Sequence, residues 1–282
     1  MNPRLLILKL ILLTAAAFAL FSADFMSFEL SQPLRTTAGL VLLAAFLVAA
    51  VTAYLLQNLR GRGWRLGIAL FLAFYSLNTV LVAVEAYYLS DVLPLPLALR
   101  LLVNGAIAAG LFTLASLWIF GRLQEGTETG IPPFWLGMSW FRWVIGLLLC
   151  AFCWVVLFII VGSLVFRPLA LALAPVEAPV YFASFDALAE TQGPQILVFQ
   201  AVRGAIWALL TLPLLRLLKG DWRKVGVQLG LAFAVWMGVN LLYPSGLSVR
   251  IQTAHFVEVA LENFLYGLLL AWFFAPRAEK VV

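Results

Sequence analysis

Charged residues are scarce in this 282-residue chain: 11% of its residues are charged and 64% are hydrophobic. A soluble domain usually has about a quarter charged residues and fewer than half apolar ones. Too few charged side chains are therefore present to cover a soluble fold of this length. The composition indicates a membrane protein, in which lipid surrounds the apolar side chains.

Histidine and cysteine are also scarce, which excludes most metal and redox sites. His255 is the only histidine, so neither the His-Glu-x-x-His motif of zinc proteases nor the paired Glu-x-x-His motifs of iron-binding bundles can be present. Cys150 and Cys153 lie within an apolar run with no basic neighbour, so packing is favoured over redox chemistry. The sequence also lacks a phosphate-binding loop and a Gly-x-Ser-x-Gly nucleophile motif. We expect no cofactor and no bound metal.

The formal net charge of +5 comes from short basic clusters that lie between long apolar runs. Nucleic-acid binding would need a basic face with base-reading or stacking side chains, and the sequence shows no such pattern. Basic clusters that flank apolar runs are typical of the loops of multi-span membrane proteins. We therefore expect membrane lipids as partners and no nucleic acid.

Apolar runs of about 20 residues, long enough to cross the hydrocarbon core, recur along the whole chain. The predicted spans lie near 5–22, 38–57, 66–89, 97–120, 141–164, 196–218, 225–243 and 254–275. The first could also be a signal peptide, but Lys9 interrupts its apolar run and Phe21 fits badly three residues before a cut after Ala23. We interpret it as an uncleaved first span. The predicted fold is an all-α polytopic transmembrane bundle of eight spans.

Lys and Arg alternate in number between successive loops. Thirteen of them lie on the side that holds both termini and four on the opposite side, while Arg203 lies within a span. Because positively charged loops stay in the cytoplasm, both termini are predicted to be cytoplasmic. A missed or invented span would destroy this alternation, so the charge pattern also supports the eight spans. The predicted location is the inner membrane of a bacterium.

Spans two to four resemble spans six to eight. Residues 55–65 and 214–224 both contain Leu-Leu, then a basic residue and Gly, then Trp followed by a basic residue. Apolar sequences also align by chance, and a basic turn with Trp can recur as an interface anchor. A true repeat would divide a single membrane domain into four-span halves, 1–137 and 138–282. Because four is an even number, the halves would be parallel, related by an axis along the membrane normal.

Polar and ionisable side chains within the spans gather towards the outer half of the membrane. Such residues are costly in lipid and are by default candidates for a functional site. Helical spacing places His255, Glu258 and Glu262 on one face of the last span. The candidate binding residues are Glu85, Gln200, Arg203, Asn240, Arg250, His255, Glu258 and Glu262.

Arg203 and Glu262 have opposite charge and matching depth, each about 12 Å below the outer boundary at 1.5 Å per residue. We therefore expect them to meet directly or through one water, with Gln200 and Glu258 in the same cavity. Arg203–Glu262 and Arg250–Glu258 could instead be ion pairs that only hold helices together. The surplus of carboxylates within the spans favours a protonatable or cation-binding site.

Two proline-containing stretches flank Gln200 and Arg203. The connection 165–195 contains four prolines and few charges. It could lie on the membrane surface or cap the cavity, or it could be a loose linker. Pro213 frees the carbonyl group of Leu209 and is expected to kink the sixth span.

Three functions fit this pattern. A transporter or lipid-handling permease for a small solute, ion or lipid head group fits the repeat best and requires a cavity open to the external face. An intramembrane enzyme on a lipid-linked substrate would use His255 as base, within reach of a carboxylate, and Arg203 or Arg250 to hold a phosphate. A non-catalytic subunit of a larger complex would bury a broad apolar flank against a membrane-protein partner. Because the sequence contains no recognisable catalytic or cofactor-binding motif, catalysis is the less favoured interpretation.

Overall fold

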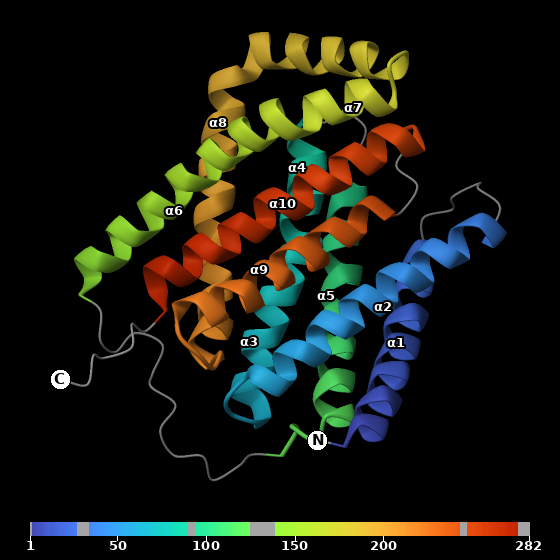
Figure 1. Cartoon of the computed structure of the whole chain (residues 1–282), viewed down its shortest axis with the longest axis vertical. Coiled ribbons are helices and arrows are strands. Elements are labelled where there is room, and N and C mark those ends of the chain that lie inside the picture. Colours follow the sequence, from blue (N-terminus) through green and yellow to red (C-terminus); the bar gives the residue numbers. More distant parts are fainter. Residues whose placement is uncertain (1, 27–33, 90–93, 125–138, 243–246, 276–282) are drawn as a thin grey trace. The chain divides into compact units, whose positions relative to one another are not determined.

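The computed structural model describes residues 2–26, 34–89, 94–124, 139–242 and 247–275, and these residues are almost entirely helical (Figure 1). Within these ranges, 8 helical stretches are long and apolar enough to cross a membrane. A helix satisfies its backbone hydrogen bonds internally, as lipid requires. The predicted all-α bundle with eight apolar spans is confirmed.

Six of the eight spans begin and end within a few residues of their predicted limits. The third and fifth spans each contain a π-helical turn (η1 and η2), and the seventh ends in a 3-10 turn (η3). The elements are α1 (Pro3–Met26), α2 (Leu34–Asn58), α3 (Gly63–Tyr75), η1 (Ser76–Val80), α4 (Leu81–Leu89), α5 (Leu95–Ile119), α6 (Trp140–Val161), η2 (Gly162–Phe166), α7 (Arg167–Leu173), α8 (Glu177–Leu217), α9 (Trp222–Gly238), η3 (Val239–Leu242) and α10 (Val249–Phe274).

The fifth and sixth spans are longer than predicted, because the connection 165–195 is helical. The helix of the fifth span continues to Leu173, and α8 begins at Glu177. Pro179 does not prevent this, since it lies in the first turn of α8, where no intrahelical N–H bond is lost. Pro168 lies where the π-helical turn η2 passes into α7, and the helix continues through it. The loose-linker interpretation of this connection is wrong.

Helix α8 changes direction along its length: in Figure 1 its first part runs across the top of the view and the rest turns downward. Gly193 and Pro194 lie in its interior, and Pro both removes a backbone hydrogen bond and clashes with the preceding turn. Glycine and proline within a long helix are common causes of a bend. The helix then continues through Pro213 to Leu217.

The chain forms two compact units, one of Met1–Leu136 with Leu210–Gly220 and one of Gly137–Leu209 with Asp221–Val282. They differ from the expected halves 1–137 and 138–282 mainly in the assignment of residues 210–220. In the first unit α2 and α5 pack against α1, and α3 packs against α5. In the second unit α10 packs along α9 and also contacts α6 and α7.

The pairing of α9 with α10 depends on glycine. A Cβ atom at Gly267 would lie 2.5 Å from the Cα of Gly230, so the two backbones are in direct contact. Small residues at a helix crossing allow this approach and the dispersion contacts that hold membrane helices together. The α9–α10 pair thereby positions the polar face of α10 within the second unit.

Candidate functional site

Arg203 lies on α8 in the second unit, and aromatic rings surround its charge. Only 4% of the residue is exposed. Its guanidinium carbon lies 4.3 Å from the ring centroid of Trp207 and 5.5 Å from that of Trp154. These distances lie within the range of cation–π attraction, which is stronger where water is excluded. The rings therefore stabilise a positive charge inside a span.

Gln200 joins Arg203 to α6. Its Oε1 accepts hydrogen bonds from Nε1 of Trp154 at 2.9 Å and from Nη1 of Arg203 at 3.4 Å. Gln200 lies one helical turn before Arg203, so both side chains share one face of α8. Trp154 was not among the residues predicted for the site. The signal that could have found it is a Trp deep in an apolar run, whose N–H group needs a hydrogen-bond partner when buried.

Tyr266 of α10 completes the aromatic surroundings. Its ring centroid lies 5.1 Å from that of Trp154, and its hydroxyl donates a hydrogen bond to the carbonyl oxygen of Gly204 at 2.6 Å. A Cβ atom at Gly204 would lie 2.6 Å from the Cβ of Trp154, so this position requires glycine. Together these contacts fix α6, α8 and α10 against one another.

The same hydrogen bond sets the register between α8 and α10. A helical side chain points back towards the N-terminus of its own helix, so the Tyr266 hydroxyl reaches the level of the preceding turn, where Glu262 lies. Its acceptor Gly204 is adjacent to Arg203. Arg203 and Glu262 thus lie at similar levels of neighbouring helices, both buried. Direct contact between their charged groups stays a prediction.

The acidic residues of α10 form a row that begins at His255. The Nδ1 of His255 and the Oε2 of Glu258 are 2.6 Å apart, and the side-chain exposure falls from 31% for His255 to 6% for Glu258. Glu262 lies one turn further along the same face and is also buried. Protonatable groups at this spacing lead from a half-exposed position into the interior of the second unit.

The π-helical turn η2 faces the start of this row. The other Glu258 oxygen, Oε1, lies 3.2 Å from where a Cβ atom at Gly162 would be, so the glycine leaves room for the carboxylate. At the other end of η2, the rings of Phe166 and His255 are 5.1 Å apart. Single π-turns inside helices are frequent at functional sites. This turn was not predicted, because nothing in the local apolar pattern distinguishes it from an α-helix.

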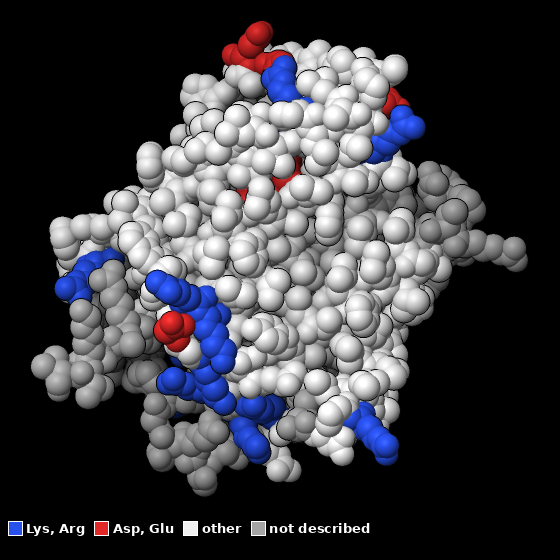
Figure 2. Space-filling view, in the orientation of Figure 1, with Lys and Arg blue, Asp and Glu red and all other residues white. Residues whose placement is uncertain are grey.

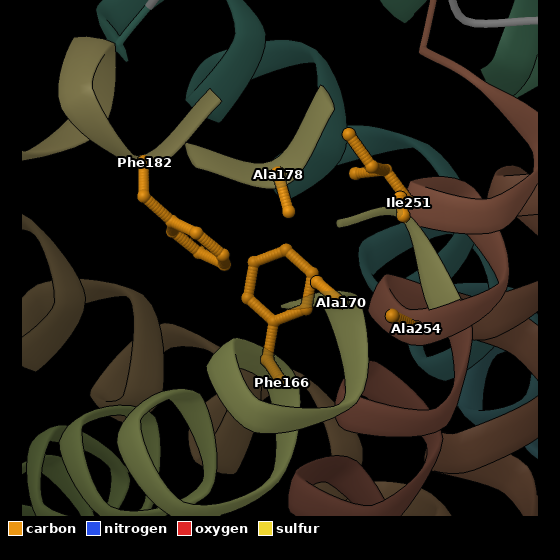
Figure 3. Close-up of a cluster of buried hydrophobic side chains, with 7 residues drawn as sticks. Phe166, Ala170, Ala178, Phe182, Ile251 and Ala254 are labelled. Carbon is orange, nitrogen blue, oxygen red and sulfur yellow. The ribbon is translucent and has the colours of Figure 1, made fainter. Parts of the chain in front are cut away.

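An apolar cluster lies beside the His255 end of the row. The ring of Phe166 packs towards Phe182 of α8, and small side chains of α7, α8 and α10 fill the space beside it (Figure 3). The members are Phe166, Ala170, Ala174, Ala178, Phe182, Ile251 and Ala254. An ion pair between Arg167 and Asp186, 3.0 Å long, joins α7 to α8 on the exposed side. Residues 166–182 are thus packed on α10, and a role as a cap over a cavity stays a prediction.

Three of the predicted site residues are placed differently. Glu85 lies in the first unit, half-buried on α4. The Asn240 side chain donates to the carbonyl oxygens of its own helix at Trp236 and Met237. Arg250 is exposed in the first turn of α10, about 12 Å along the helix axis from Glu258, which is hydrogen-bonded to His255.

Within the described ranges, no three His, Cys, Asp or Glu side chains are grouped so that they could hold a metal ion. The cysteines Cys150 and Cys153 are free thiols, the first of them buried. No protein-family model, no curated protein and no solved structure matches the chain. The fold and the side-chain arrangement of the second unit are therefore the basis for a functional assignment.

Proposed function

We propose that this chain is a transporter or lipid-handling permease of the bacterial inner membrane, with both termini in the cytoplasm. Its polar site in the outer half of the membrane takes a small solute, ion or lipid head group. One observation carries the proposal: the row His255–Glu258–Glu262 leads from a half-exposed histidine to carboxylates buried in a span. Chains of His and Glu inside membrane spans are characteristic of proton relays in pumps and transporters.

The row suggests how transport is coupled to protons. A proton that enters at His255 is passed to Glu258 across the 2.6 Å hydrogen bond and then to Glu262, one turn further in. Protonation removes the negative charge of a buried carboxylate, so it changes the attraction between α10 and the cation Arg203 on α8. Loading and release of the proton would thus bias the packing of these two helices.

Proteoliposomes that contain the purified chain and the pH dye pyranine test this proposal. A potassium potential imposed with valinomycin should drive proton entry, and Glu258→Gln and Glu262→Gln should abolish it. Glu190→Gln is the matched control, because Glu190 is exposed on α8. In parallel, dicyclohexylcarbodiimide, which modifies protonated carboxyls in lipid, should label Glu262 of the wild type. Absence of both proton entry and labelling would contradict the proposal.

A second function, intramembrane catalysis on a lipid-linked substrate, is favoured by the same hydrogen bond. A carboxylate on Nδ1 fixes the tautomer of a histidine and leaves Nε2 to act as base. The wild type and His255→Gln, each incubated with a bacterial lipid extract, distinguish the two functions. A lipid that disappears only with the wild type, as measured by mass spectrometry, would establish catalysis. Identical lipid profiles combined with His255-dependent proton entry would favour transport.

A further inference from the structure

The turn between α2 and α3 is joined to the end of α8 by main-chain hydrogen bonds, all within the first unit. Leu59 and Leu218 form an antiparallel bridge. The flanking bonds run from Arg60 N–H to Leu217 C=O at 2.7 Å and from Lys219 N–H to Asn58 C=O at 2.9 Å. Two chain segments distant in sequence are therefore held at a fixed separation.

This bridge decides where the basic side chains point. Neighbouring side chains of an extended segment lie on opposite faces. Leu59 and Leu218 are buried, at 0% and 4% exposure, so the adjacent Arg60 and Lys219 are directed to the other face, and both are exposed. Two cations from different segments are thus displayed together on one small surface.

Further basic residues and an aromatic side chain continue this surface. Arg62 and Arg65 are exposed, and Trp64 between them is 60% exposed. The Arg65 guanidinium carbon lies 5.6 Å from the Trp64 ring centroid. Exposed tryptophan at the end of a span is typical of the level of the lipid head groups. Figure 2 shows that charged side chains occur in small groups separated by broad uncharged surface.

We propose that an anionic phospholipid head group binds at this surface, with its phosphate between Arg60 and Lys219. Arginine and lysine both donate hydrogen bonds to phosphate oxygens, and basic clusters at the ends of spans attract anionic lipids. The acyl chains would run along the apolar spans, beside Trp64. A lipid held there links the α2–α3 turn to the end of α8, so it stabilises the bridge between them.

Arg122 stabilises the α2–α3 turn but is not part of the proposed lipid site, so its substitution is a control for the lipid experiment. Arg122 donates from its guanidinium to the carbonyl oxygens at the end of α2 and in the turn: Leu56 at 3.0 Å, Leu59 at 3.3 Å and Gly61 at 3.0 Å. These carbonyls would otherwise lack helical partners. Arg122→Gln should therefore destabilise the chain whatever lipid surrounds it.

The test uses the full chain in nanodiscs of phosphatidylcholine, with or without phosphatidylglycerol, and measures Tm. Phosphatidylglycerol should raise the Tm of the wild type, and Arg60→Gln with Lys219→Gln should remove most of that rise. Arg4→Gln with Arg142→Gln removes the same charge from exposed positions elsewhere and should keep the rise. Arg122→Gln should lower the Tm equally in both lipids.

Native mass spectrometry gives a second measurement, the number of phosphatidylglycerol molecules that remain bound. The Arg60/Lys219 double variant should bind this lipid about tenfold more weakly or worse. Equal loss in the Arg4/Arg142 control would show general charge attraction and overturn the proposed site. An equal Tm rise from inorganic phosphate in phosphatidylcholine discs would show a phosphate site rather than a lipid site.

Discussion

Gly204 illustrates how one residue determines the packing around Arg203. Its missing side chain lets α8 approach Trp154 so closely that a Cβ atom would overlap the Trp154 side chain. We expect Gly204→Ala to destabilise the protein by about 1–3 kcal/mol, the usual cost of overpacking a tight core. Thermal unfolding in detergent measures this. Gly110→Ala is the control, because nothing lies within 4 Å of a Cβ atom there, and it should leave the Tm unchanged or raise it.

Substitutions at Arg203 and Glu262 distinguish an ion pair that only holds helices together from a functional site. If they form a dry structural pair, Arg203→Ala and Glu262→Ala should each cost about 3–5 kcal/mol, because each strands a buried charge. The double variant would then recover much of the loss. We expect the other result: the losses of stability in the two single variants add in the double variant rather than cancel, and proton entry is lost in both single variants. Strong destabilisation rescued in the double variant would contradict a functional site.

At the scale of elements, residues 167–182 are held on α10 by apolar packing rather than by the ion pair between Arg167 and Asp186. Ala178 is fully buried in the cluster around Phe166, whereas the Arg167 and Asp186 side chains are about half exposed. We expect Ala178→Leu to cost about 1–3 kcal/mol and Asp186→Asn less than about 1 kcal/mol. Hydrogen exchange of residues 167–182 should speed up in the first variant only. Faster exchange in Asp186→Asn alone would contradict this assignment.

The bridge between Leu59 and Leu218 joins two segments that the predicted repeat aligns with each other. In the alignment of residues 55–61 with 214–220, Leu59 corresponds to Leu218, and Arg60 to Lys219. The two flanking hydrogen bonds are those of any antiparallel bridge of this kind, so they leave the repeat a prediction. We expect an experimental structure to superpose spans 2–4 on spans 6–8 by rotation about the membrane normal. Superposition only after inversion through the membrane plane would contradict the parallel repeat.

At the scale of the whole molecule, the membrane orientation is the principal prediction. Reporter fusions after Arg62, Arg122 and Lys219 should report the cytoplasm, because these loops are rich in basic residues. Fusions after Glu29, Asp91 and Asp186 should report the external side. Paired alkaline phosphatase and fluorescent-protein fusions measure both outcomes at each position. A single position with the opposite result would contradict the eight-span topology with cytoplasmic termini.

Sequence alone determined the fold class and the spans, because lipid imposes a simple requirement. A spanning segment needs about 20 apolar residues, and its backbone must be helical, so composition and run length suffice. Helical spacing also predicted that His255, Glu258 and Glu262 share one face of α10. The sequence misplaced the start of α8 at residue 196, because the prolines of 165–195 look like breaks. Pro179 instead lies in the first turn of α8, and Pro168 and Pro194 lie within helices.

Only the tertiary structure decided which side chains meet. The hydrogen bond from Trp154 to Gln200 joins residues 46 positions apart, and that from Tyr266 to Gly204 joins residues 62 positions apart. Local periodicity carries no information about such contacts, since they depend on how one helix is rotated and shifted against another. For the same reason the sequence left open an ion pair between Arg250 and Glu258, whereas packing buried Glu258 against η2 and His255 and left Arg250 exposed.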